Sequence, residues 1–242
     1  MFCFRCKAFL KSDNVVRLTR VLSLKWCKIV HCLRKLNCGI LVGFVFLAVR
    51  CHWLLARGSV QMFAPNVDQM HVVNHCEGKP IAEKRNVLEE SARIARGDVS
   101  DLAKLEVTAF DALVIPGECV SPFRYNLCQF YTPGLQCAST AQYILCQLTA
   151  LVMCCISPVL AAKALPGCEI TVGQDKECER WPYAKTATSM KELGCKHVNK
   201  KVGEVHIDVK NKLVTSAFMC NAPIHEVFDR VGVMVTELLK LA

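Results

Sequence analysis

The stretch Leu148–Pro158, LTALVMCCISP, carries the clearest indication of the fold. Its apolar part up to Cys154 predicts a buried strand, and Pro158 predicts the first turn of a following helix, where a missing N–H costs nothing. Cys155 would then occupy a tight strand-to-helix turn at the positive end of the helix dipole, which favours the thiolate. Cys155 is therefore the candidate nucleophile, and the alternative is an inert buried thiol, since free cysteines are commonly buried.

Upstream of this turn, short apolar runs alternate with a helical pattern. Val60–Phe63 and Ala112–Ile115 have the length and composition of strands, and the second run ends abruptly at Pro116. Between them, residues 66–80 are predicted as loop and turn, and Asn86–Arg96 has helical spacing. A strand, a helix and a strand of these lengths predict a parallel α/β sheet.

The part of the chain after Cys155 continues the same alternation. The pattern predicts strands over Glu169–Val172, Val205–Asp208 and Leu213–Thr215, and helices over Lys185–Leu193 and Pro223–Leu241. The second and third of these strands are joined by a turn at Asn211 and predict a hairpin.

Positive charge is concentrated at the N-terminus. Residues 1–57 hold eleven of the 30 Lys and Arg residues and a single acid, Asp13, whereas the rest of the chain is close to neutral. The basic and apolar residues alternate over Val15–Lys25, which is typical of a mitochondrial transit peptide. A nucleic-acid-binding protein would need its basic residues on the folded face, so nucleic acid is not an expected partner.

The 17 cysteines do not indicate a disulfide framework, because the chain is long and apolar and the count is odd. A reducing compartment follows. Cys3 and Cys6 have CxxC spacing, but no second pair follows at a distance typical of zinc sites. We therefore expect no metal and no cofactor.

Two apolar runs, 39–56 and 139–162, raise the alternative of a membrane anchor, and residues 125–162 contain no charged side chain. Arg50 would lie within the first span, where a charge is costly, and Pro158 would interrupt the second. Buried elements are therefore favoured over membrane association.

Several long strings resemble one family. They are FAPNVDQMHVVNH at 63–75, RNVLEESARIARG at 85–97, CCISPVLAAK at 154–163, NKLVT at 211–215 and WPYA at 181–184. These strings look like the mitochondrial glutamine amidotransferase-like class 1 domain proteins, vertebrate relatives of the bacterial ElbB glyoxalase in the PfpI superfamily. The resemblance implies a flavodoxin-like three-layer α/β/α sandwich with a mostly parallel sheet over 58–242. It also implies a mitochondrial address, a nucleophile elbow at Cys155, and backbone N–H groups of Gly117 and Ile156 as oxyanion donors.

The chain departs from the family pattern at three places. Family members carry an acidic residue in a loop after the first strand, and residues 1–57 contain no such loop and only Asp13. The family's Pro-Gly-Gly is replaced by Pro116-Gly117-Glu118, and a divergent stretch fills 119–152. The missing first strand would have to be replaced by Ile40–Val49.

The departures favour a catalytically impaired family member, a pseudoenzyme. One alternative is an active glyoxalase or deglycase that uses Cys155 on small, glyoxal-type carbonyl substrates, and another is a membrane-anchored protein. True glutamine amidotransfer would need a histidine base. The histidines outside the N-terminal segment, His71, His75, His197, His206 and His225, are predicted at loop or surface positions. Self-association is left open.

Overall fold

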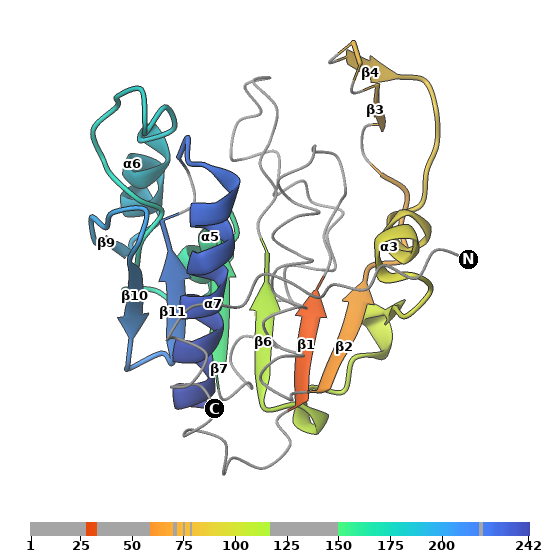
Figure 1. The fold of residues 1–242 in the computed structure, drawn as a ribbon. Coiled ribbons are helices and arrows are strands. Elements are labelled where there is room, and N and C mark those ends of the chain that lie inside the picture. Colours follow the sequence, from red (N-terminus) through yellow and green to blue (C-terminus); the bar gives the residue numbers. More distant parts are fainter. Residues whose placement is uncertain are drawn as a thin grey trace, which may run out of the picture.

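A computed structural model describes residues 28–32, 59–69, 72–74, 76–77, 79–116, 150–217 and 220–242 (Figure 1). Its centre is a seven-stranded sheet in the order β10-β11-β7-β6-β1-β2-β5. Strand β10 runs antiparallel to β11, and the other neighbours are parallel, so the predicted mostly parallel sheet is confirmed. The strands span Lys28–Cys32 (β1), Ser59–Ala64 (β2), Ser100–Asp101 (β5), Ala112–Ile115 (β6), Ala150–Cys154 (β7), Val205–Asp208 (β10) and Leu213–Ser216 (β11).

Strands β6, β7 and β11 are buried at every position, as expected for a parallel sheet covered on both faces. In β6 and β7, Leu113 and Met153 join the apolar cluster on one face, while Val114 and Val152 join the cluster on the other. This explains why both segments are continuous apolar runs and not alternating ones.

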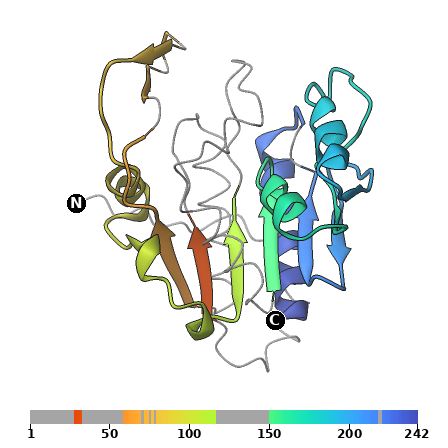
Figure 2. The ribbon, with the colours of Figure 1, turned by 180° about the vertical axis from the view of Figure 1, so that it is seen from behind.

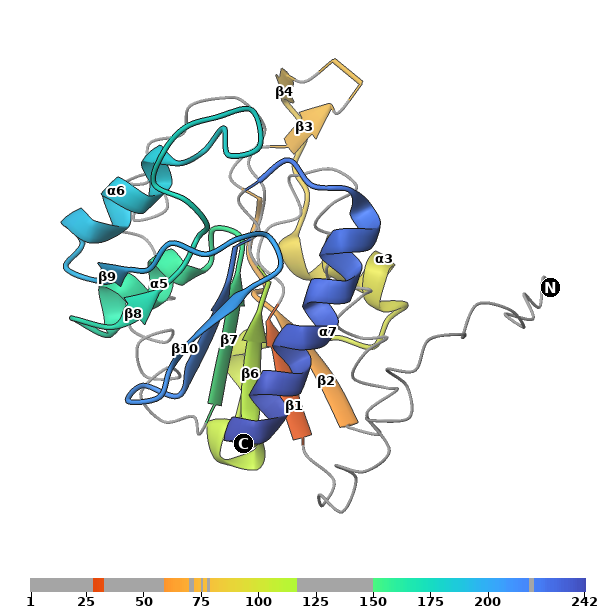
Figure 3. The same ribbon diagram turned by 60° about the vertical axis from the view of Figure 1, so that its left-hand side comes forward.

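Helices cover both faces of the sheet (Figures 2 and 3). Helices α3 (Val87–Ala95) and α7 (Ile224–Leu241) pack on one face, and α5 (Pro158–Ala164) and α6 (Lys185–Glu192) on the other. Two short 3₁₀ turns, Leu102–Lys104 and Val107–Ala109, also close over the face of α5 and α6. The predicted three-layer α/β/α sandwich is therefore confirmed.

The strand order identifies the kind of sandwich. Taken in chain order, the five central parallel strands are β1, β2, β6, β7 and β11, and their spatial order is 2-1-3-4-5. This is the flavodoxin-like order, in which ligands bind outside the carboxyl ends of the strands. Cys155 directly follows the fourth of these strands and so lies at that edge.

The first strand is not where the sequence suggested. Ile40–Val49 lies outside the described residues, and the central position is filled by Lys28–Cys32, which pairs with both β2 and β6. The sequence KIVHC contains two β-branched residues, which favour a strand. It was not predicted as a strand because basic residues flank it and the longer apolar run Ile40–Val49 was the stronger candidate. The N-terminal segment thus contributes a central strand to the sheet.

Two small sheets were also missed. Within the predicted loop 66–80, β3 (Val72–Asn74) and β4 (Lys79–Ile81) form an antiparallel pair. The strand expected over Glu169–Val172 is shorter, β8 (Glu169–Ile170), and pairs with β9 (Lys196–His197) outside the main sheet. Strands of two or three residues are too short for periodicity to reveal.

None of the helices in the described parts of the chain is long and apolar enough to cross a membrane. The described part of the apolar run 139–162 forms β7, the turn after it and most of α5.

Candidate functional site

The strand-to-helix turn predicted around Cys155 is present, and we call Cys154–Pro158 the elbow. Strand β7 ends at Cys154, a turn covers Cys155–Ser157, and Pro158 is the first residue of α5. Cys155 has φ = +59°, in the left-handed region that only glycine adopts without cost. Non-glycine residues in this conformation concentrate at functional sites, where the surrounding structure holds them.

Ser157 fixes the elbow to the sheet, a role that the sequence did not reveal. Its hydroxyl oxygen lies 2.9 Å from the N–H of Cys154, from which it accepts, and 2.7 Å from the carbonyl oxygen of Ile115 on the neighbouring strand β6. The carbonyl oxygen of Cys154 is 2.8 Å away as a second acceptor. A serine just before the N1 proline of a helix is the only local signal of this contact, because the partner Ile115 is 42 residues away.

The two cysteines of the elbow are both buried. Cys154 is 0% exposed and Cys155 is 5% exposed. Both belong to the apolar cluster between the sheet and α7, which includes Val227 and Val231. Cys155 therefore sits against apolar side chains and is almost inaccessible to solvent.

Of the two expected oxyanion donors, the structure describes only Ile156. Gly117 lies outside the described residues, as does Glu118 beside it. Ile156 is partly buried within the elbow, and its carbonyl accepts from Val159 at 3.2 Å. The oxyanion role of both residues stays a prediction.

Two histidines predicted at loop or surface positions lie on strands instead. The imidazole of His197 on β9 accepts at Nε2 from the N–H of Val172 at 3.2 Å, and burial lowers its pKa. His206 on β10 has its Nε2 3.4 Å from a carboxylate oxygen of Glu169. His197 was misplaced because β9 could not be recognised from the sequence, whereas His206 lies within the strand that was predicted over Val205–Asp208 and is partly buried there.

Neither of these histidines borders the elbow in the sheet. His206 pairs with Thr215 on β11, which in turn pairs with Met153, so one whole strand separates β10 from β7. His225 is exposed at the start of α7, and His71 and His75 lie outside the described residues.

Other thiols of the chain show what an inert buried cysteine looks like. Burial raises the pKa of Cys168 to about 12, with the nearby Cys195 and Asp208 adding to the effect. Such a thiol stays protonated at physiological pH and is a poor nucleophile. Within the described ranges, no group of three or more His, Cys, Asp and Glu side chains could hold a metal ion.

Comparison with known proteins adds the family. No family model matches the chain. The human mitochondrial glutamine amidotransferase-like class 1 domain-containing protein 3 is 44% identical over 203 residues, which cover 80% of this chain and 75% of that protein.

Two solved structures share the fold. The isoprenoid biosynthesis protein with an amidotransferase-like domain from Ehrlichia chaffeensis superposes with a TM-score of 0.72 at 26% identity, covering 89% of this chain and 99% of that one. A ThiJ/PfpI family protein from Pseudomonas syringae has a TM-score of 0.53 at 12% identity and covers 97% of this chain and 77% of its own. Together with the sandwich and its elbow cysteine, the similarity to the human protein shows that the chain belongs to the family of glutamine amidotransferase-like class 1 domain proteins.

Proposed function

We propose that this chain is a mitochondrial PfpI-type protein in which the nucleophile elbow persists while catalysis is impaired. The observation that carries the proposal is a contrast at one site. The backbone at Cys155 keeps the strained conformation of a nucleophile elbow, yet the thiol is 5% exposed and packs in an apolar cluster. The acid that the family resemblance places after the first strand has no counterpart in residues 1–57 except Asp13.

The missing acid matters because of the chemistry of carbonyl addition. A thiolate that attacks an aldehyde forms a C–S bond, and the carbonyl electron pair moves to oxygen, which must then be protonated or stabilised. A carboxyl group that shares the thiol proton serves both steps. The family resemblance implies that Glu118 replaces a glycine whose backbone approaches the elbow cysteine, so its carboxylate would add negative charge where negative charge develops. Each change is expected to slow the reaction by orders of magnitude.

The alternative is an active cysteine enzyme of the glyoxalase or deglycase type. The left-handed conformation of Cys155 supports it, because such strain is kept where a side chain has a task. Its substrates would be small glyoxal-type carbonyls, and their turnover would require Cys155.

Alkylation of the folded protein distinguishes the impaired protein from the active cysteine enzyme. We would follow iodoacetamide labelling of each cysteine by peptide mass spectrometry between pH 5.5 and 9. The exposed Cys76 and Cys178 serve as controls for ordinary thiols and the fully buried Cys154 as an unreactive one. We expect Cys155 to react no faster than Cys76 at pH 6. Faster labelling of Cys155 at that pH would mean an activated thiolate and would favour the enzyme.

Turnover gives a second measurement. Methylglyoxal consumption by the full chain is expected to equal that of the Cys155→Ala variant. A rate that disappears in the variant while its thermal stability is retained would overturn the proposed impairment.

The mitochondrial part of the proposal has two supports. One is the basic N-terminal segment with its single acid, and the other is the similarity to a human protein that is named as mitochondrial. A fluorescent protein fused behind residues 1–57 is expected to enter mitochondria. Replacing Arg17 and Arg20 with glutamate should abolish this, and a fusion that stays outside mitochondria would contradict the assignment.

A further inference from the structure

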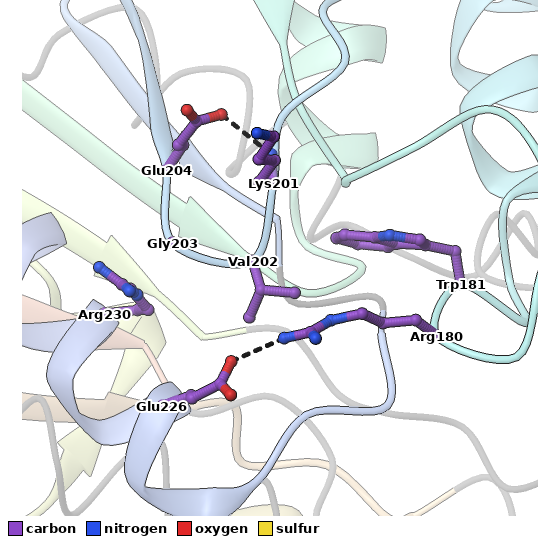
Figure 4. Close-up of a pocket in the computed structure, with 8 residues that line it drawn as sticks. All are labelled: Arg180, Trp181, Lys201, Val202, Gly203, Glu204, Glu226 and Arg230. Atoms are coloured by element: carbon purple, nitrogen blue, oxygen red, sulfur yellow. Dashed lines mark hydrogen bonds and ion pairs between the residues drawn. The ribbon is translucent and has the colours of Figure 1, made fainter.

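A pocket of about 560 Å³ opens at the carboxyl edge of the sheet, between the segment before β10 and the start of α7 (Figure 4). The strand register places it there. Val205 at the start of β10 pairs with Ser216 at the end of β11, and Ser216 pairs with Cys154. Cys155 itself does not line the pocket. The lining residues are Arg180, Trp181, Lys201, Val202, Gly203, Glu204, Glu226 and Arg230.

The charges of the pocket are unevenly satisfied. Both acids have partners within the protein, since Glu226 forms an ion pair with Arg180 at 2.8 Å and Glu204 accepts from the backbone N–H of Lys201 at 3.0 Å. Among the described residues, the ammonium of Lys201 and the guanidinium of Arg230 have no acidic partner. The pocket therefore holds two cations that are available to a ligand.

Arg230 is the more telling of the two. Its Nε is buried and has no hydrogen-bond partner in the described part of the chain. A buried donor without an acceptor is destabilising, so it points to an acceptor that the protein alone does not supply. Arginine is also the side chain best suited to bind a carboxylate or phosphate through two parallel hydrogen bonds.

The glycine beside Arg230 is part of the same arrangement. A Cβ atom on Gly203 would lie 2.8 Å from both Cζ and Nη2 of Arg230, closer than such atoms approach. Glycine at 203 thus lets the guanidinium lie against the backbone. Figure 4 shows Arg230 and Gly203 on one side of the pocket and the ring of Trp181 on the other.

Trp181 provides a fixed apolar wall. A side chain at Gly173 would clash with its ring, so the ring lies directly on the Gly173 backbone. Trp181 also packs with Val202 and Ala217 in a small apolar cluster. The motif WPYA, which belongs to the family resemblance, therefore contributes a wall of this pocket.

We propose that this pocket binds a small organic anion, with a carboxylate or phosphate head held by Arg230 and Lys201 and an apolar body against Trp181 and Val202. The volume is in the range of sites for small molecules, about 300 to 1,000 Å³. The inference goes beyond the proposed function because it requires no chemistry at Cys155, and an impaired enzyme would retain this site as a binding site.

The test is calorimetric titration of the full chain with three probes that share an aromatic body: phenylacetate, phenyl phosphate and benzylamine. We expect saturable binding of at least one of the two anions and none of the cation benzylamine. The comparison of the two anions then identifies the preferred head group. No saturable binding of either anion, or equal binding of benzylamine, would overturn the proposal.

Variants of the lining residues test whether the anion binds in this pocket. Arg230→Gln is expected to weaken anion binding by about tenfold to a hundredfold, as the loss of a charged hydrogen bond does, and Lys201→Gln by less. Gly203→Ala keeps every charge but displaces the guanidinium, so it should weaken binding even if Arg230→Gln fails to fold. Lys210→Gln, in the turn between β10 and β11 at the opposite edge, is the control and should bind as wild type does. Unchanged binding in folded Arg230→Gln or Gly203→Ala would refute this site.

Discussion

Two of the polar contacts that fasten neighbouring segments to this sheet differ in the groups that they use. At the elbow, the hydroxyl of Ser157 bridges Cys154 and Ile115. On the other side of β11, the small sheet of β8 and β9 is held by an ionised group, the carboxylate of Asp208, which accepts from the N–H of Glu169 at 2.8 Å.

The difference determines how each region responds to pH. A serine hydroxyl does not titrate, so the backbone of the elbow keeps its hydrogen bonds from acid to alkaline solution. The small sheet is held in part by Asp208 and by the neutral imidazole of His197, both of which titrate, beside a buried contact from the N–H of Thr171 to the hydroxyl of Thr215, which does not. A pH dependence of alkylation at Cys155 therefore reports on the thiol and its neighbours and not on loss of the elbow. The following predictions test this contrast, beginning with the largest effect.

Asp208→Ala is expected to lower the free energy of unfolding most, by about 2 to 3 kcal/mol, since hydrogen bonds to a charged group are lost and the partly buried N–H groups of Glu169 and Asn211 lose their acceptor. The carboxylate is 6% exposed and also accepts from the N–H and side chain of Asn211 at 3.1 and 2.7 Å. Urea unfolding followed by circular dichroism measures the effect. Asp229→Ala, at an exposed position on α7, is the control, and an equal effect in both would remove the special role of Asp208.

Ser157→Ala should cost about 1 to 2 kcal/mol, because the buried N–H of Cys154 and carbonyl of Ile115 lose their partner. The loss of unfolding free energy should be the same at pH 5 and pH 8. The loss in Asp208→Ala, in contrast, should become smaller at strongly acid pH, where the carboxylate is protonated. Thr188→Ala, exposed on α6, serves as the control and should change stability by less than about 0.5 kcal/mol. A cost that varies with pH would contradict a purely hydroxyl-based contact.

Glycine and alanine at position 155 measure the strain of the elbow. Cys155→Gly is expected to be more stable than Cys155→Ala by about 1 kcal/mol or less, because relief of a left-handed conformation is partly offset by the entropy of glycine in the unfolded chain. Arg96 at the end of α3 has φ = +57° at an exposed position, and the same pair of substitutions there should give a similar difference. Equal stability of the two variants at 155 would mean that the elbow relaxes when its thiol is removed.

The smallest expected effect is the pH dependence due to His197. Burial lowers its folded-state pKa below the ordinary value of 6.5, so the unfolded chain binds more protons between the two values. Its contribution to stability is present above pH 6.5 and is lost as the pH falls through the folded-state pKa. His197→Gln keeps an acceptor for Val172 without a titrating group. It should therefore flatten the decline in unfolding midpoint between pH 7 and pH 5, and an unchanged decline would assign it to other groups.

The titration of Asp208 lies outside this window. Burial acts to raise its pKa, but hydrogen bonds from Glu169 and Asn211 outweigh that effect, and the pKa is lowered from 3.8. Its stabilising contribution is therefore present above pH 3.8 and is lost only as the pH falls through the lower, folded-state value.

The sequence predicted the elements that have strong local signals. Ala112–Ile115 and the hairpin at Val205–Thr215 were found because their apolar patterns are short and clearly bounded. The elbow was found because a proline after an apolar strand and a small turn marks the start of a helix.

What the sequence could not predict depends on partners distant in the chain. Lys28–Cys32 pairs with both β2 and β6, and its two β-branched residues alone are too weak a signal to predict this. The contact from Ser157 to Ile115 and the pairing of β8 with β9 likewise exist only in the folded chain. The pocket at Arg230 combines two loops and one helix that are far apart in the chain, so local spacing could not predict it.

The position of β1 also limits how this protein can mature. Because Lys28–Cys32 lies between β2 and β6, a leader removed during import into mitochondria must be cleaved before Lys28 if the sheet is to stay closed. Cleavage after Cys32 would open two inner edges whose unpaired N–H and carbonyl groups would template association between chains. Removal of β1 would therefore convert two paired inner edges of the sheet into sites of aggregation.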